Sequence, residues 1–164
     1  MKLFFVLIVI SFSTIFSQSI SRNSSSSAFA NLIVPLSISS TFGSLDYGEI
    51  ILTKTKFQRN IPPQSGKLFV INGHPGRGVT IMFNSITLSN TGVSSSPIGN
   101  ITTIPFSPKV VQENNSNVKN GQTINLVNNG KAGELKLWVG GIISIEPNQA
   151  SGLYSGNFTI TVSY

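Results

Sequence analysis

Few residues of this chain are able to perform acid, base or nucleophilic chemistry. The sequence contains one histidine, His74, five Asp and Glu residues and no cysteine. A histidine works as a general base only beside a nucleophile and an orienting acid, and the sequence nominates neither. Asp46 and Glu49 are close enough to pair, but they flank Gly48 in the manner of turn and cap residues. We therefore expect no enzymatic activity, no cofactor and no metal site.

A glycine-rich segment at residues 73–78, Gly-His-Pro-Gly-Arg-Gly, superficially resembles a phosphate-binding loop. Such loops lead from a strand into a helix whose N-terminus holds the phosphate. Here the strand pattern Val-Thr-Ile-Met-Phe follows at residues 79–83. The segment is therefore expected to be a hairpin connection.

The charge of the chain is low and scattered. Only 10% of the residues are charged and 40% are hydrophobic. Lys54, Lys56, Arg59 and Lys67 form the densest basic group, without the interleaved aromatic residues of a nucleic-acid surface. We expect no nucleic-acid partner, and the apolar excess indicates surface that another molecule covers.

The first residues have the layout of a secretory signal peptide. Lys2 precedes an apolar run from Leu3 to Phe16, and small polar residues follow. The run is shorter than the roughly 20 residues that span a bilayer. We expect a cleaved signal peptide at residues 1–19, a flexible Ser-rich leader at 20–27 and one domain at 28–164. We therefore expect an exported protein that is located in the periplasm, at the cell surface or outside the cell and is not stably inserted in a membrane.

Short strand patterns separated by turn residues fill the remaining sequence. They lie at residues 50–57, 67–71, 79–83, 86–88, 124–127 and 135–145, and no window outside the first residues has a helical period. This organisation predicts an all-β fold, an antiparallel sandwich of the immunoglobulin or pilin type. Trp138 falls on the opposite parity from Leu135 and Leu137, which places it on an outer face, in a second small cluster, at a contact with a neighbour or beneath a loop.

The region 89–122 is rich in Ser, Asn, Thr and Pro, with weak strand patterns near 101–106 and 110–111. We expect a long surface loop region there with one or two short strands at these positions, and loops of this length are often functional. If the chain binds something other than itself, this region is the first candidate, and Phe106 is its only aromatic residue.

Two segments have one parity that is apolar throughout. From residue 28 onward one parity is apolar, which predicts a long strand, at an edge because Pro35 lacks an amide hydrogen. The last residues alternate in the same way, so the terminus is expected to be tied into a sheet. The candidate contact residues are Ala28, Ala30, Leu32 and Val34 in the first segment, and Gly152, Phe158, Ile160, Val162 and Tyr164 in the last.

Several motifs resemble the bacterial domain family of unknown function 4402, exported β-sandwich proteins regarded as related to pilins. The motifs lie at residues 28–36, 45–50, 69–73, 137–141, 150–156 and 158–164. A fainter similarity to chaperone–usher pilins comes from the separation of Gly152 and Tyr164. In those pilins an N-terminal extension supplies a missing strand to the neighbouring subunit, by β-strand addition.

The resemblance implies a non-enzymatic, secreted structural subunit of a fimbria-like surface filament that associates with itself or with other surface proteins. Residues 28–34 are a candidate donor strand, and they are equally compatible with the first strand of the chain's own sandwich. The alternative function is a monomeric or surface-tethered adhesin or carbohydrate-binding module that uses residues 89–122.

Overall fold

The computed structural model describes residues 24–41, 43–92 and 99–164. The predicted signal peptide, residues 1–19, and the first four residues of the predicted leader lie outside this part. Residues 32–164 form one compact unit, and the described residues before them, 24–31, do not belong to it. Residues 24–31 are exposed and contain no strand. The compact unit is an antiparallel β-sandwich, which confirms the expected fold class.

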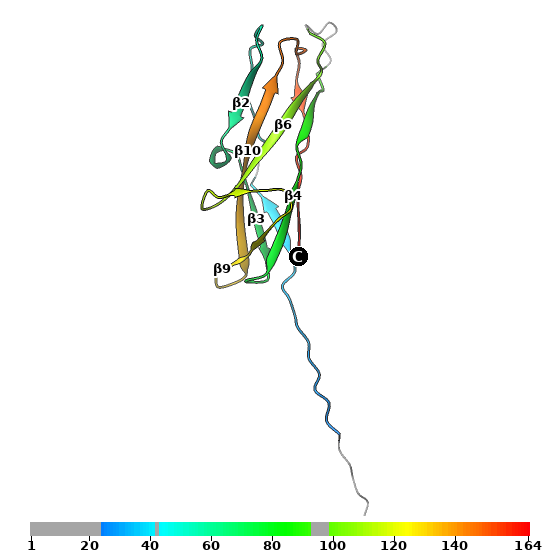
Figure 1. The fold of residues 1–164 in the computed structure, drawn as a ribbon, viewed down its shortest axis with the longest axis vertical. Coiled ribbons are helices and arrows are strands. Elements are labelled where there is room, and N and C mark those ends of the chain that lie inside the picture. Colours follow the sequence, from blue (N-terminus) through cyan, green and yellow to red (C-terminus); the bar gives the residue numbers. More distant parts are fainter. Residues whose placement is uncertain (1–23, 42, 93–98) are drawn as a thin grey trace, which may run out of the picture. The chain divides into compact units, whose positions relative to one another are not determined.

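The larger sheet is built around β10 (Gly133–Ile145), the longest strand. On one side β10 pairs with β6 (Thr103–Gln112). On the other side it pairs first with β3 (Lys67–Gly73) and then, further along, with β2 (Phe57–Ile61). Figure 1 shows β10 between these neighbours. One central strand therefore organises the whole sheet.

Shorter strands complete the larger sheet. β1 (Ser37–Ser40) pairs with the free side of β3, and β5 (Ile86–Asn90) lies between β6 and β11 (Tyr154–Ser155). β7 (Asn117–Val118) pairs with β6, and β9 (Val127–Asn128) pairs with β10.

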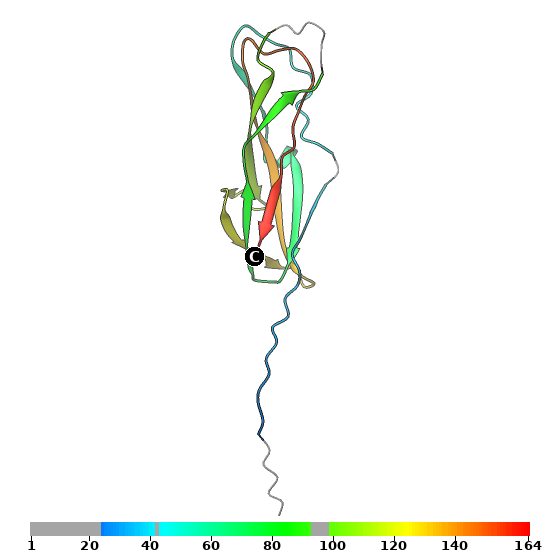
Figure 2. The ribbon, with the colours of Figure 1, turned by 90° about the vertical axis from the view of Figure 1, so that its right-hand side faces the viewer.

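The smaller sheet has the order β12 (Ile160–Ser163), β4 (Gly78–Phe83) and β8 (Gln122–Asn125). The chain passes from the smaller to the larger sheet between β4 and β5, and back again between β11 and β12. Figure 2 shows β12, in red, ending at the C-terminus beside the turn that follows β3. The last strand thus lies at the edge of its sheet.

The main core lies between the two sheets. The apolar residues of β10 that share one parity are buried, as the sequence pattern predicted, and Leu135, Leu137 and Val139 pack in one cluster with residues of the smaller sheet. The complete buried set is Ile71, Val79, Ile81, Val110, Val118, Leu126, Leu135, Leu137, Val139 and Ile160. Trp138 is half-buried on the opposite face, where the register places it beside Leu68 and Val111.

The glycine pair in β10 makes room for two close approaches. A side chain at Gly140 would collide with the backbone of Ile61 and Pro62, where the chain crosses from β2 through the 3₁₀ turn η1 (Pro63–Ser65) to β3. A side chain at Gly141 would collide with the ring of Phe106. These glycines let two strands follow each other along the same edge of β10.

Two strand predictions are wrong in extent. The strand expected from residue 28 begins only at Ser37, because Ser37 pairs with Asn72 and β3 ends one residue later, so no partner remains for the preceding residues. The strand expected at 50–57 begins only at Phe57. From Phe57 onward β2 pairs with residues 141–145 of β10, whereas residues 50–56 form no strand.

The short strands expected near 101–106 and 110–111 are parts of one continuous strand, β6, which occupies residues 103–112, so the central part of the region 89–122 is not a loop. β6 contains two prolines. Pro105 pairs only with β5 and Pro108 only with β10, so each proline lies where β6 has a partner on one side. Phe106 is 3% exposed and cannot serve as a binding surface.

Candidate functional site

A second apolar cluster lies beyond the main core, and its cover is incomplete. Ile104, Phe106, Ile143 and Ile145 of the larger sheet form its buried part. No strand of the smaller sheet reaches over them in the described chain, because β12 and β4 pair only between residues 160–163 and 80–83. Residues 44–52 and residues 149–158, two mostly irregular segments, cover this cluster instead.

The first of these segments turns three apolar side chains toward the cluster. Gly48 has a φ of 68°, and the Gly48 N–H donates to the Asp46 carboxylate over 2.8 Å. This turn shifts the alternation, so that Leu45, Tyr47 and Ile50 all pack inward. The expected turn role of Asp46 is confirmed.

Tyr47 ties the segment to the central strand. Its hydroxyl donates to the Gly141 carbonyl oxygen over 2.9 Å. Burial raises the pKa of the Tyr47 hydroxyl to about 12, because the ionised form would lose its hydration. Tyr47 therefore remains a neutral hydrogen-bond donor at physiological pH.

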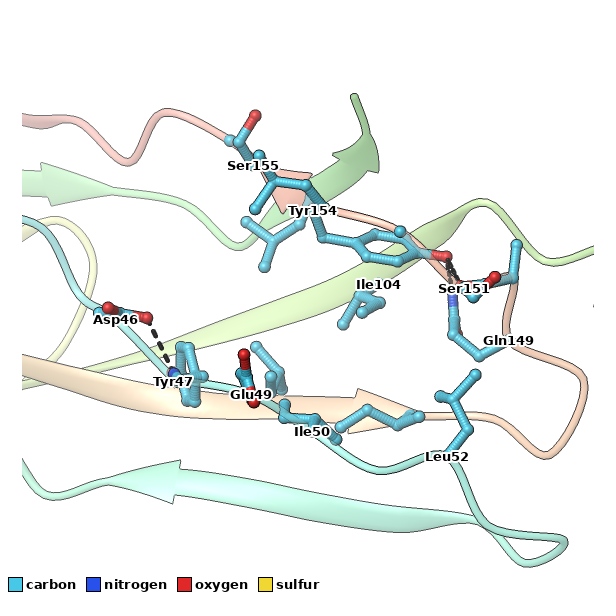
Figure 3. Close-up of a pocket in the computed structure, with 18 of the residues that line it drawn as sticks. Asp46, Tyr47, Glu49, Ile50, Leu52, Ile104, Gln149, Ser151, Tyr154 and Ser155 are labelled. Carbon is cyan, nitrogen blue, oxygen red and sulfur yellow. Dashed lines mark hydrogen bonds between the residues drawn. The ribbon is translucent and has the colours of Figure 1, made fainter. Parts of the chain in front are cut away.

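An open groove of about 870 Å³ runs between residues 44–52 and residues 149–156. Ile104, Ile143 and Ile145 form its floor. Figure 3 shows Tyr47, Ile50 and Leu52 along one side and Tyr154 and Gln149 on the other. The lining is mainly apolar, as expected for a site that binds aliphatic side chains.

One wall of this groove has free backbone groups, and the other has a free strand edge. Within the described residues, the backbone N–H and C=O groups of residues 44–52 make no hydrogen bond to other backbone groups, whereas on the opposite wall the N–H groups of Gln149 and Ala150 and the Leu153 carbonyl oxygen are already bonded. β11 pairs only with β5, and β12 only with β4, so the opposite edge of each is unpaired in the described chain. An extended peptide in the groove would find hydrogen-bonding partners on either side.

Gln149 and Tyr154 form the polar end of the groove. Gln149 is 2% exposed, and its Nε2, which carries two hydrogens, lies within hydrogen-bonding distance of three acceptors: the carbonyl oxygens of Ile101 (2.7 Å) and Thr103 (3.2 Å) and the Tyr154 hydroxyl (2.9 Å). The Tyr154 hydroxyl lies 2.7 Å from the Ala150 carbonyl oxygen, to which it donates. Sequence analysis missed Gln149, because a glutamine after Pro147-Asn148 carries the ordinary pattern of an exposed turn.

The predicted C-terminal contact residues lie in the last strand and on either side of it. Ile160 is buried and Val162 is half-buried in the main core, while Phe158 touches both clusters and meets Phe83 and Phe106 edge-on at 6.3 and 5.8 Å between ring centroids. Gly152 has a φ of 145° and packs against the Asn90 side chain.

Tyr164 directly follows β12 and bonds to residues at the start of the domain. Its hydroxyl donates to the Val34 carbonyl oxygen and accepts from the His74 N–H, each over 2.7 Å. The Val34 N–H donates to His74 Nδ1 over 3.4 Å, and the Arg77 guanidinium lies 4.6 Å from the centre of the Tyr164 ring. His74 is therefore a structural residue of this junction.

The predicted donor residues Ala28, Ala30, Leu32 and Val34 form no strand, and all are exposed. Phe29 is 95% and Leu32 is 83% exposed. Of these four residues, only Val34 contacts one of the predicted C-terminal contact residues, since its carbonyl oxygen accepts a hydrogen bond from the Tyr164 hydroxyl.

The described residues contain no group of three or more His, Asp or Glu side chains placed to hold a metal ion. The glycine-rich segment at 73–78 connects β3 of the larger sheet to β4 of the smaller sheet, so it is not the hairpin that was expected. No helix in the described part of the chain has the length and apolarity needed to cross a bilayer.

The fold and groove define an antiparallel β-sandwich with one incompletely covered end. The sequence matches the family described as a domain of unknown function, DUF4402, over residues 36–164. The chain therefore belongs to that family, as the motif resemblance had indicated. No curated protein matches the chain.

Proposed function

We propose that this chain is a non-enzymatic structural subunit of a surface filament, and that each copy inserts residues 28–34 into the groove of another copy. The observation that carries the proposal is the groove itself, an apolar channel between residues 44–52, whose backbone groups bond to no other backbone group in the described chain, and the unpaired edge of β11. This is the arrangement that β-strand addition requires, since main-chain hydrogen bonds supply affinity and alternate side chains supply specificity.

The segment at residues 28–34 fits the groove in length and chemistry. Seven residues in a strand span about 23 Å at about 3.3 Å per residue, comparable to the wall formed by the nine residues 44–52. Ala28, Ala30, Leu32 and Val34 share one face, and no residue of the segment is charged. Burying a Leu or Val side chain contributes about 1.5–3 kcal/mol.

Export is part of the same proposal. A subunit that assembles at a surface must leave the cytoplasm, and the first residues have the layout of a secretory signal peptide. Stability without disulfides rests on packing and strand pairing, since the chain has no cysteine. The competing adhesin hypothesis loses support because Phe106, the only aromatic residue at 89–122, is buried.

The test compares assembly of the chain from Ile20 onward with that of two single variants. Leu32→Asp places a carboxylate on the apolar face of the donor segment, and Asn31→Asp places the same group on the opposite face. We expect oligomers or filaments from the wild type and from Asn31→Asp, by size-exclusion chromatography and negative-stain microscopy. Leu32→Asp should weaken association at least about 100-fold, because its charge would be buried in the groove.

Circular dichroism and thermal unfolding of the Leu32→Asp monomer separate donation from folding. A folded monomer supports donation in trans. An unfolded one would assign residues 28–34 to the chain's own sandwich. A wild type that stays monomeric at all concentrations would also overturn the proposal.

A further inference from the structure

The candidate donor segment is apolar on both of its faces. Residues 28–34 read Ala-Phe-Ala-Asn-Leu-Ile-Val, so Asn31 is the one polar residue among them. A strand with one face in water alternates between apolar and polar residues, whereas a strand covered on both faces reads as a nearly continuous apolar run. Phe29 and Ile33, whose parity is opposite to that of Leu32, are therefore expected to be covered as well once the segment is inserted.

The floor of the groove covers only one face of such a strand. Ile104, Ile143 and Ile145 form this floor, and they would contact the side chains that share the parity of Leu32. Side chains of the other parity would stand at the open side of the groove, because successive side chains of a strand point to opposite faces. A cover for Phe29 and Ile33 therefore has to come from the rim of the groove.

Two large apolar side chains stand on opposite rims. Ile51 is 87% exposed and Leu153 is 68% exposed, and both line the groove. Each follows or precedes a residue that packs on the second cluster, Ile50 on one wall and Tyr154 on the other, and Figure 3 shows these two residues on opposite sides of the groove. Since neighbouring side chains of an extended chain point to opposite faces, Ile51 and Leu153 belong to the outer face of the two walls.

A strand between the walls would bring its outer side chains beside this rim. Neighbouring strands of a sheet lie about 4.7–4.9 Å apart, and the Cβ atoms of facing residues are about 5 Å apart. Long apolar side chains reach each other across this spacing. An outer side chain of the inserted strand would thus lie in a row between Ile51 and Leu153.

We infer that Ile51 and Leu153 form an apolar rim that binds the outer side chains Phe29 and Ile33 of the inserted strand. This inference rests on the proposed function, since the strand belongs to a second copy of the chain. Large apolar side chains that are exposed on both partners cover each other in the assembly. The inserted segment is then recognised on both faces and not by its inward parity alone.

The experiment measures the affinity of synthetic peptides with the sequence of residues 24–36 for the Leu32→Asp chain, whose own segment cannot be inserted. Three further receptors add Ile51→Ala, Leu153→Ala or Val127→Ala. The last is the matched control, because Val127 is 69% exposed in β9 and does not line the groove. We expect each rim substitution to weaken binding of the unmodified peptide about threefold or more, and the control to leave it unchanged.

The same receptors are measured with peptides that carry Phe29→Ala or Ile33→Ala. A contact that one substitution has already removed cannot be lost again, so the combined loss should be smaller than the product of the single losses. We expect this difference to be about threefold or more for each rim substitution with at least one of the two peptides. Asn31→Ala is the control peptide, since it changes the polar residue of the same face, and its effect should multiply with that of either rim substitution.

The outcomes separate the inference from the proposed function. If the unmodified peptide binds but every combined loss equals the product of the single losses, the rim does not contact the outer face, and the inference is overturned while the proposed function stands. If the unmodified peptide does not bind the Leu32→Asp chain, both fail. Because Ile51 and Leu153 are exposed, alanine at either position should leave the receptor folded, which circular dichroism checks.

Discussion

At the scale of single residues, Tyr47 joins the groove wall to the floor of the sandwich through its bond to the Gly141 carbonyl oxygen. We expect Tyr47→Phe to lower the free energy of unfolding by about 1 kcal/mol at neutral pH, the usual contribution of such a hydrogen bond. Urea unfolding monitored by circular dichroism would measure this change.

The same residue has a pH signature. Because the folded protein raises the pKa of Tyr47 from 10.0 to about 12, the folded state holds its proton where the unfolded state loses it. Its contribution to stability is complete below about pH 10 and is lost as the pH rises toward 12. Tyr47→Phe should therefore unfold with a shallower dependence on alkaline pH. An unchanged slope would contradict the assigned role.

The residues of the site differ in how clearly the sequence alone predicts their burial. The apolar parity of β10 and of residues 158–164 predicted which side chains face the core, because alternation reflects burial directly. Gln149 gave no such signal. Its burial depends on where residues 101–103 and 154 lie, and these contacts join distant parts of the chain.

At the scale of elements, β10 could be predicted, and β6 could be predicted only as two short pieces, while the groove wall could not be predicted. Proline normally marks a loop, and only the register shows that Pro105 and Pro108 each have a partner strand on one side. Residues 44–52 look like a strand in part, yet they pair with nothing in the described chain. Whether a segment pairs depends on the space beside it, which local sequence does not contain.

The crossing of η1 over β10 depends on Gly140. In Gly140→Ala the new methyl group would meet the Ile61 carbonyl oxygen and lie 2.7 Å from the Pro62 carbonyl carbon, and backbone atoms cannot move aside easily. We expect a loss of about 1–3 kcal/mol in unfolding free energy, measured by urea unfolding.

Gly78→Ala is the matched control for this change. The nearest atoms there belong to the side chains of Thr123 and Asn125, at 3.0 and 3.2 Å, which are able to shift. Gly78→Ala should cost less than Gly140→Ala. Similar losses for both variants would show that the crossing does not depend on the missing side chain.

At the scale of the whole molecule, the two apolar clusters differ in how completely the rest of the chain covers them. The main core is closed by two sheets, whereas the second cluster is closed by irregular segments that leave a groove. A copy that donates a strand through one surface and accepts one through another forms a heterologous contact, and such contacts generate open filaments. An incomplete sandwich is thus consistent with a chain that becomes fully stable only in an assembly.

This difference predicts that filling the groove stabilises the molecule. The Leu32→Asp chain mixed with the peptide of residues 24–36 should unfold at a temperature that rises with peptide concentration. At a hundredfold excess over Kd the gain is about 2.7 kcal/mol, which corresponds to about 5–10 °C for a domain of this size. The control is the same peptide with the Leu32→Asp substitution, which places a carboxylate on the apolar face. Because that charge would have to be buried in the groove, this peptide should leave the unfolding temperature unchanged. An equal rise with both peptides would mean that the groove does not recognise the apolar face of the inserted strand.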